Sequence, residues 1–261
     1  MSHAAANPTV LSQLYLNAVL PCLEDLSEQD PVAQQILGSA NASILLRIVG
    51  GPAATVQFNC ARVRWQPGRQ RSPSVVLLFL SHSHLNAFFS GKQWAVPLPL
   101  WGGWRVGLLA LFARLAQRLE AVLDGHASVL ESPDGRRLHA RLSLITAGLG
   151  LQALAQGDAA SRSLLRHLPP GLASFSIEGE SRATVWFDHN RTDNAAGWGD
   201  PPRLPEVCIV FDGVQTAFAA LREEIDTFAA VGGGQIRVQG LVPLADGLNV
   251  VMQRLRVYLK P

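Results

Sequence analysis

The chain has 261 residues, of which 48% are hydrophobic and only 16% are charged, and its formal net charge is +2. This composition excludes an intrinsically disordered protein, and the small net charge argues against a nucleic-acid-binding protein. The length allows one large domain or two small ones, and either division can bury a core. Three widely spaced cysteines predict neither a zinc site nor a disulfide framework. Because the first 20 residues lack Lys and Arg, they do not resemble a signal peptide, and we expect a cytoplasmic chain.

The first half of the sequence predicts helices, then strands, then helices. Residues 7–37 have helical spacing in two pieces, and Asp30 can cap the second piece. Runs rich in Val, Ile, Leu and Phe predict strands at 43–49, 55–63 and 74–80. A short helix at 84–90 and a long one at 105–123 follow. Residues 94–113 have transmembrane length, but Pro and Gly break the first part of this span, so a buried amphipathic helix is favoured in its second part.

The same order of elements returns after a turn-rich stretch at 126–136. Helices are predicted at 138–155 and 159–167, and strands at 172–177, 183–188 and 207–211. Helices at 216–221 and 223–230, an alternating strand at 235–240 and a last helix at 246–259 complete the chain.

The repetition extends to individual residues. At an offset of 129, six of the eleven positions from Ile48 to Phe58 are identical to those from Ile177 to Phe187. The later strands and the long helices match in the same order, down to a shared Gln-Arg-Leu at residues 117–119 and 253–255. We therefore predict an α+β fold of two similar units, each with a mostly antiparallel sheet of about four to five strands covered by helices on one face. The first unit spans 1–125, a linker spans 126–136, and the second unit spans 137–261.

Candidates for catalysis and metal binding are weak. His82 and His84 could begin a metal site, but no acidic or Cys partner lies nearby, and a capped turn between a strand and a helix is the favoured interpretation. Asp188 and His189 could form half of a triad, yet spacing identifies no nucleophile. We therefore predict no catalytic residue, no metal and no cofactor. An enzyme that handles acyl groups through His82, His84 or His189 remains the third hypothesis.

One loop is both basic and aromatic. Arg62 and Arg64 precede Trp65 and Arg69 and Arg71 follow it, in the loop between predicted strands. Such a loop suits a phosphate headgroup or an acidic partner as well as a soluble hairpin, and we predict no nucleic-acid partner.

The second half of the chain resembles the sterol carrier protein type-two family. The resemblance lies in Phe211 followed by a helix, in the strand motif at Gly234, Ile236, Val238 and Gly240, and in a Leu/Met-rich last helix. It covers roughly residues 138–261 and extends more weakly to the first half through the repeat. Leu241 stands where the family often has Asp, and in the first half Pro97 replaces the second Gly of the motif.

The resemblance implies a non-enzymatic protein that binds or carries a long apolar ligand, such as a fatty acyl, isoprenoid (quinone) or sterol-like lipid, in a tunnel between sheet and helices. The predicted apolar lining consists of Phe211, Phe218, Ile225, Phe228, Val238, Leu248, Val251, Met252 and Leu255 in the second unit, and of Phe88, Trp94, Leu108 and Phe112 in the first. The predicted surface for a membrane or a lipid-metabolism partner consists of Trp101, Trp104, Arg62, Arg64 and Trp65. The alternative is an interaction scaffold or accessory factor for lipid or quinone biosynthesis, with solid cores and partner-binding Trp/Arg surfaces.

Overall fold

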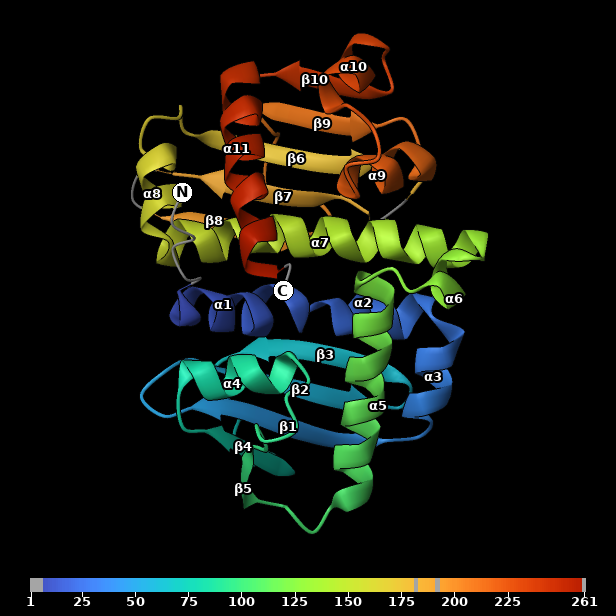
Figure 1. The fold of residues 1–261 in the computed structure, drawn as a ribbon, viewed down its shortest axis with the longest axis vertical. Helices are drawn as coiled ribbons and strands as arrows, with labels where there is room; N and C mark the ends of the chain where they lie inside the picture. Colours follow the sequence, from blue (N-terminus) through green and yellow to red (C-terminus); the bar gives the residue numbers. More distant parts are fainter. Residues whose placement is uncertain (1–6, 181–182, 191–192, 260–261) are drawn as a thin grey trace. The chain divides into compact units, whose positions relative to one another are not determined.

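The computed structural model describes residues 7–180, 183–190 and 193–259. The chain divides into two compact units, Met1–Ala121 (unit 1) and Val122–Pro261 (unit 2). Each unit has its own five-stranded sheet with helices packed on it (Figure 1). The predicted α+β class with two similar units is therefore confirmed.

Unit 1 begins with a nearly continuous helical segment and ends with a long helix. Its elements are α1 (Pro8–Leu14), the π-helical η1 (Tyr15–Val19), α2 (Cys22–Gln29), α3 (Pro31–Leu37), β1 (Asn41–Ile48), β2 (Ala53–Asn59), β3 (Arg62–Pro67), β4 (Val75–Phe79), α4 (His82–Phe89), β5 (Leu98–Trp101) and α5 (Val106–Leu123).

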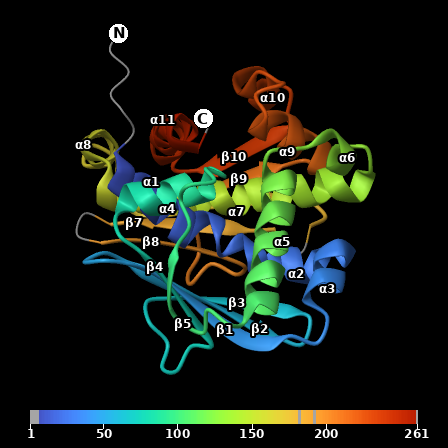
Figure 2. The same ribbon diagram turned by 60° about the horizontal axis from the view of Figure 1, so that its bottom comes forward.

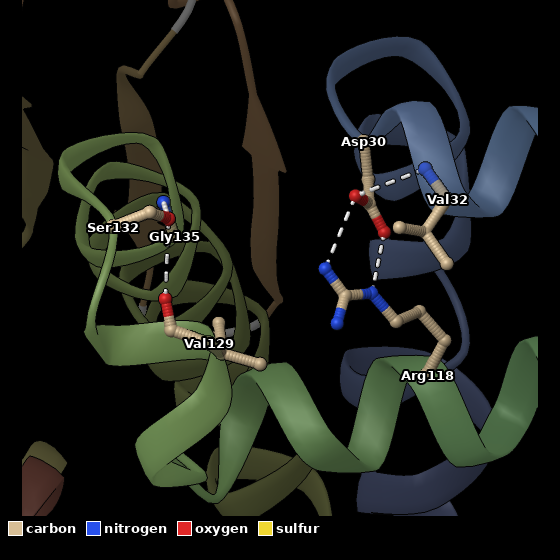
Figure 3. Close-up of polar contacts among 6 residues, drawn as sticks. All are labelled: Asp30, Val32, Arg118, Val129, Ser132 and Gly135. Carbon is tan, nitrogen blue, oxygen red and sulfur yellow. Dashed lines mark hydrogen bonds and ion pairs between the residues drawn. The ribbon is translucent and has the colours of Figure 1, made fainter.

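Unit 2 follows the same plan with a longer first helix. Its elements are α6 (Ala127–Leu130), α7 (Pro133–Gly157), α8 (Ala159–Leu165), β6 (Gly171–Ile177), β7 (Val185–His189), β8 (Asn194–Trp198), β9 (Val207–Phe211), α9 (Val214–Leu221), α10 (Thr227–Gly232), β10 (Ile236–Gly240) and α11 (Val242–Leu259). The stretch predicted as a linker thus holds α6 and the first turn of α7, which Ser132 caps by accepting the N–H of Gly135 (Figure 3).

The two sheets share one topology. The strand order is β3-β2-β1-β4-β5 in unit 1 and, in the corresponding direction, β8-β7-β6-β9-β10 in unit 2. In each sheet the third and fourth strands of this order, β1 with β4 and β6 with β9, are parallel, and the other three pairs are antiparallel. Figures 1 and 2 show α4 and α5 on one face of the first sheet, and α9 and α11 on one face of the second.

The repeated residues occupy equivalent places in the two sheets. Ile48 faces Phe79 in the parallel ladder of unit 1, and Ile177 faces Phe211 in that of unit 2. The pairs Val56/Val185 and Phe58/Phe187 are fully buried in their cores. The glycines at 50 and 179 both have positive φ values, 65° and 79°, in the turn after the first strand, where other residues are strained. The repeat therefore preserves the core and one obligatory turn.

The structure corrects the predicted strand at residues 55–63. A two-residue turn at Cys60 and Ala61, both with positive φ, divides it into β2 and β3. Such turns usually have Asn or Gly at their two central positions, and here Cys60 and Ala61 occupy them, so the sequence does not mark the hairpin. As a consequence Arg62, Arg64 and Trp65 lie in strand β3, and the predicted basic loop begins only after it.

Three further elements differ from the prediction. Strand β8 has the sequence Asn-Ala-Ala-Gly-Trp, which has low strand propensity and was not predicted. Strand β5 contains Pro99, which a sheet tolerates because β5 is an edge strand. It pairs with β4, with a register shift between Val76 and Leu77. Helix α10 begins only at Thr227, where Asp226 caps it, so Glu223 lies in the preceding turn and not in a helix.

None of the helices among the described residues is long and apolar enough to cross a bilayer. The apolar span at 94–113 instead contributes the edge strand β5 and the first part of α5.

Candidate functional site

The histidines at the start of α4 are occupied by structural contacts. Ser81 caps the helix by accepting the N–H of His84, as the favoured interpretation predicted. The His82 Nδ1 atom lies 2.6 Å from the hydroxyl oxygen of Ser12, and the His84 Nδ1 atom accepts the backbone N–H of Leu80. Across the described part of the chain, no group of three or more His, Cys, Asp or Glu side chains could hold a metal ion.

Asp188 and His189 contribute to a polar pocket of about 420 Å³ at the end of β7, together with Asn190, Arg203 and Glu206. The two do not form a catalytic pair: the His189 Nδ1 atom lies 2.9 Å from the Asn194 side-chain oxygen, while Asp188 forms an ion pair with Arg203. Arg203 also pairs with Glu206. The N–H of Leu172, together with Arg203, lowers the pKa of the Glu206 carboxyl below its usual value. None of the described residues that line this pocket is a Ser, Thr or Cys that could act as a nucleophile.

The predicted lining residues of unit 2 fall into two groups. Leu248, Val251 and Leu255 on α11, together with Phe211, are buried. Phe218 is partly buried because its ring contacts the imidazole of His139 and the guanidinium of Arg222.

The remaining members of the predicted lining are more open. Ile225, Val238 and Met252 are only partly covered, and Phe228 is 76% exposed. Val207, Ile209 and Phe211 are buried while Cys208 and Val210 are not, so the first three mark the helix-covered face of β9. Val238 pairs with Ile209 in the ladder and therefore points to that same face. Val238 is thus left incompletely covered at the β10 edge of this face.

The predicted lining residues of unit 1 are also divided. Phe112 is buried, Leu108 and Phe88 are half-buried, and Phe88 packs against Phe79. Trp94 is 69% exposed and stacks on the ring of His84. Trp94 therefore joins the surface of unit 1 and does not line an interior.

An exposed apolar segment, residues 94–106, runs from Trp94 through β5 to the start of α5. Seven large apolar side chains in it are between 46% and 69% exposed, namely Trp94, Val96, Leu98, Leu100, Trp101, Trp104 and Val106. Trp101 and Trp104 were predicted surface residues, and their rings meet edge to face with centroids 5.2 Å apart. The structure adds the four aliphatic members, which the sequence had suggested only as part of an apolar span.

The basic residues of β3 are placed differently from Trp65. Arg62 and Arg64 are exposed, but the indole N–H of Trp65 donates to the Leu16 carbonyl at 2.9 Å and its backbone N–H donates to Glu24. Trp65 thus holds β3 against the first helical segment.

A repeated ion pair fixes the last helix of each unit. In unit 1 the Arg118 guanidinium binds both carboxylate oxygens of Asp30, at 2.7 and 3.2 Å, and Asp30 also accepts the N–H of Val32 at the start of α3 (Figure 3). In unit 2 Arg254 binds Asp158 at 2.8 and 3.1 Å, and Asp158 caps α8. We call these contacts the Asp–Arg clamps. The sequence predicted the Asp30 cap and the matching arginines, but not their pairing.

The clamp of unit 2 has additional donors. Ser161 donates its hydroxyl and its backbone N–H to Asp158, and the Tyr258 hydroxyl donates at 2.9 Å. Burial would raise the pKa of Asp158, but the hydrogen bonds from Arg254, Ser161 and Tyr258 outweigh it and hold this pKa far below its usual range. Asp158 is therefore a structural anion at neutral pH.

Comparison with known proteins gives a likeness of fold only. No protein-family model and no curated protein matches the chain. Among solved structures, the sterol carrier protein domain 2 of Helicoverpa armigera is 13% identical, with a TM-score of 0.34, and the match covers 43% of this chain and 87% of that one. The palmitated sterol carrier protein 2-like 2 of Aedes aegypti is 18% identical, with a TM-score of 0.31, and the match covers 42% of this chain and 91% of that one. Function is therefore inferred below from the residues of this chain.

Proposed function

We propose that the chain is a non-enzymatic binder or carrier of a long apolar ligand, and that the binding site lies in unit 2. The observation that carries this proposal is that several apolar side chains of unit 2 remain partly or largely exposed: Val238 on the edge strand β10, Phe228 on α10, Met252 on α11, and Ile225 before α10. Ligand sites are mostly apolar with few polar groups, and a methionine side chain adapts easily to different ligand shapes.

The ligand's hydrocarbon chain would lie between α11 and strands β9 and β10. In this proposal the paired residues Val238 and Ile209 would line the sheet side of the site, and Met252 of α11 would line its helix side. Burying apolar surface contributes about 25 cal/mol per Å², so a few hundred Å² contribute several kcal/mol before ordering costs are subtracted. Fatty acyl, isoprenoid and sterol-like lipids all meet this description.

Lipid uptake by the full chain tests the proposal. Native mass spectrometry of the purified protein should show co-purified lipid, and a fluorescent fatty acid should bind in the absence of vesicles. Val238→Asp and Met252→Asp should each weaken uptake at least about tenfold, because a carboxylate must then be desolvated against the hydrocarbon chain. Val257→Asp is the matched control, since Val257 lies on another face of the same helix and is 63% exposed. A lipid-free mass with no fatty-acid uptake would overturn the proposal.

A further inference from the structure

The exposed apolar segment at residues 94–106 is held in place by contacts of its backbone with β4 and His84. Strand β5 pairs with β4, and the His84 Nε2 atom lies 3.1 Å from the Val96 carbonyl oxygen. Gly102 has a φ of +71°, and a Cβ atom there would lie 2.2 Å from the backbone oxygen of Ser74. The turn that presents Trp101 and Trp104 therefore requires glycine, and the two indoles are displayed on a fixed support.

Neither face of β5 is covered. All four residues of the strand are exposed. Because of the register shift, Leu98 pairs with Leu78 and Trp101 pairs with Val76, so Leu98 and Trp101 lie on the same face of the sheet, and both side chains are exposed to solvent. Single exposed apolar residues are common, but a continuous run of this kind indicates an interaction surface.

The charges around the segment distinguish between possible occupants. From residue 31 to residue 119 the sequence contains no Asp or Glu but nine basic residues. Not all nine lie near the segment, since Arg62 and Arg64 are on β3 at the opposite edge of the sheet and Arg118 is paired with Asp30. Lys92 lies two residues before the apolar segment, Arg105 lies within it, and both are exposed. Tryptophan prefers the headgroup level of a bilayer, and Lys and Arg near the surface are attracted to anionic lipids.

We infer that the segment at 94–106 docks unit 1 onto an anionic lipid bilayer, with Trp101 and Trp104 at the headgroup level and Lys92 and Arg105 on lipid phosphates. The inference rests on the proposed function for its purpose, because a carrier must meet the membrane that supplies or receives its lipid. The physical contact depends only on residues of unit 1.

Sedimentation with vesicles tests the inference on the full chain. Wild-type protein should pellet with vesicles of phosphatidylcholine mixed with phosphatidylglycerol, and more weakly with phosphatidylcholine alone. The Trp101→Ser/Trp104→Ser variant should bind the mixed vesicles at least about tenfold more weakly, because it loses both interfacial anchors. Leu204→Ser is the matched control: Leu204 is 90% exposed in unit 2, and this change should leave binding unaltered.

A second variant tests the electrostatic part without removing an aromatic ring. Lys92→Glu/Arg105→Glu should reduce binding to the mixed vesicles and weaken its dependence on salt, while binding to phosphatidylcholine alone changes little. Circular dichroism should show both variants folded, since every substituted side chain is exposed.

Three outcomes would overturn the inference. The first is that wild-type protein does not pellet with the mixed vesicles, and the second is that the tryptophan variant binds them as well as wild type. The third is that the tryptophan substitutions dissociate an oligomer of the protein while vesicles have no effect, which would make the segment a protein interface. Because fatty-acid uptake is measured without vesicles, failure here is distinguishable from failure of the proposed function.

Discussion

Units 1 and 2 have the same strand order and the same clamp, yet their fifth strands are used differently. Strand β10 pairs regularly with β9 from Ile236 to Gly240 and leads almost directly into α11. Strand β5 has a register shift near Pro99, exposes all its side chains and is followed by a glycine turn. Strand β5 contributes no buried side chain and β10 buries only Ile236, so the surface of this edge strand can change while the rest of the buried core stays the same.

The clamps also differ in how much each aspartate depends on its arginine. Asp158 receives hydrogen bonds from Ser161 and Tyr258 as well as from Arg254. The contacts described for Asp30 come from Arg118 and from the N–H of Val32. Loss of the arginine should therefore be felt more strongly in unit 1.

Arg118→Met should have the largest effect on stability. It leaves the Asp30 carboxylate, whose side chain is 4% exposed, without its counter-ion, and removing one partner of a buried pair costs about 3–5 kcal/mol. Urea unfolding, with hydrogen exchange to locate the loss in unit 1, measures this change. Arg114→Met is the control, because Arg114 lies exposed on the same helix. A loss below about 1 kcal/mol would show that the unit 1 clamp contributes little.

Gly148→Ala should come next and should affect unit 2. An added Cβ would lie 1.9 Å from Val185 Cγ1 and 3.1 Å from its Cβ, so α7 and β7 would have to separate. Overpacking of this kind costs about 2 kcal/mol. The double variant Gly148→Ala/Val185→Ala should recover part of the loss in the same urea assay.

Gly107→Ala is the matched control in unit 1. Gly107 lies in helix α5 with nothing within 4 Å of an added Cβ, so alanine should stabilise the helix by about 0.5–1 kcal/mol. If Gly148→Ala stabilised the protein as Gly107→Ala is expected to do, the close approach of α7 to β7 would be disproved.

Arg254→Met should destabilise unit 2 by only about 1–2 kcal/mol, because three donors to Asp158 remain. Adding Tyr258→Phe should bring the loss closer to that of Arg118→Met, and urea midpoints of the single and double variants measure the difference. Equal losses for Arg254→Met and Arg118→Met would remove the proposed distinction between the clamps.

The smallest expected effect comes from mild acid, which should change the stability of the two units in opposite directions. Burial lowers the pKa of His139 in unit 2, so below about pH 6.5 the unfolded chain takes up a proton that the folded unit refuses, and stability falls. Burial raises the pKa of Glu24 in unit 1, so the folded unit takes up its proton at a higher pH than the unfolded chain does, and acidification favours folding.

Two variants measure these opposite slopes. The change in urea midpoint between about pH 7.5 and about pH 5.5 should become smaller in His139→Gln, because glutamine does not titrate. Glu24→Gln should remove the opposing contribution and make the acid-induced loss larger when the same comparison is carried down to pH 4.5, the ordinary pKa of a glutamate. If His139→Gln kept the full pH dependence of the wild type, other groups would be responsible for it.

The sequence predicted the parts of the fold that local pattern encodes. The Val- and Ile-rich runs of β1, β4 and β9 and the Asp30 cap were correct because hydrophobic period and capping act over a few residues. The pairing of Asp30 with Arg118 joins residues 88 positions apart, and it could have been suspected only from an Asp at a helix start and a Gln-Arg-Leu in both halves.

Exposure was the main property that sequence patterns did not resolve. Trp94 and Phe228 have the same apolar character as Phe112, yet only Phe112 is covered. Whether an apolar side chain is covered depends on which distant segment packs over it, and periodicity within one helix or strand does not contain that information.

The Asp–Arg clamp also bears on how each unit is made. Asp30 leaves the ribosome 88 residues before Arg118, and Asp158 leaves it 96 residues before Arg254. Until almost the whole unit has been translated, the carboxylate therefore stays solvated and can bind only groups that are near it in the sequence. Completion of each half is thus tied to the emergence of its final helix, and a nascent chain halted before that helix should remain open to proteases.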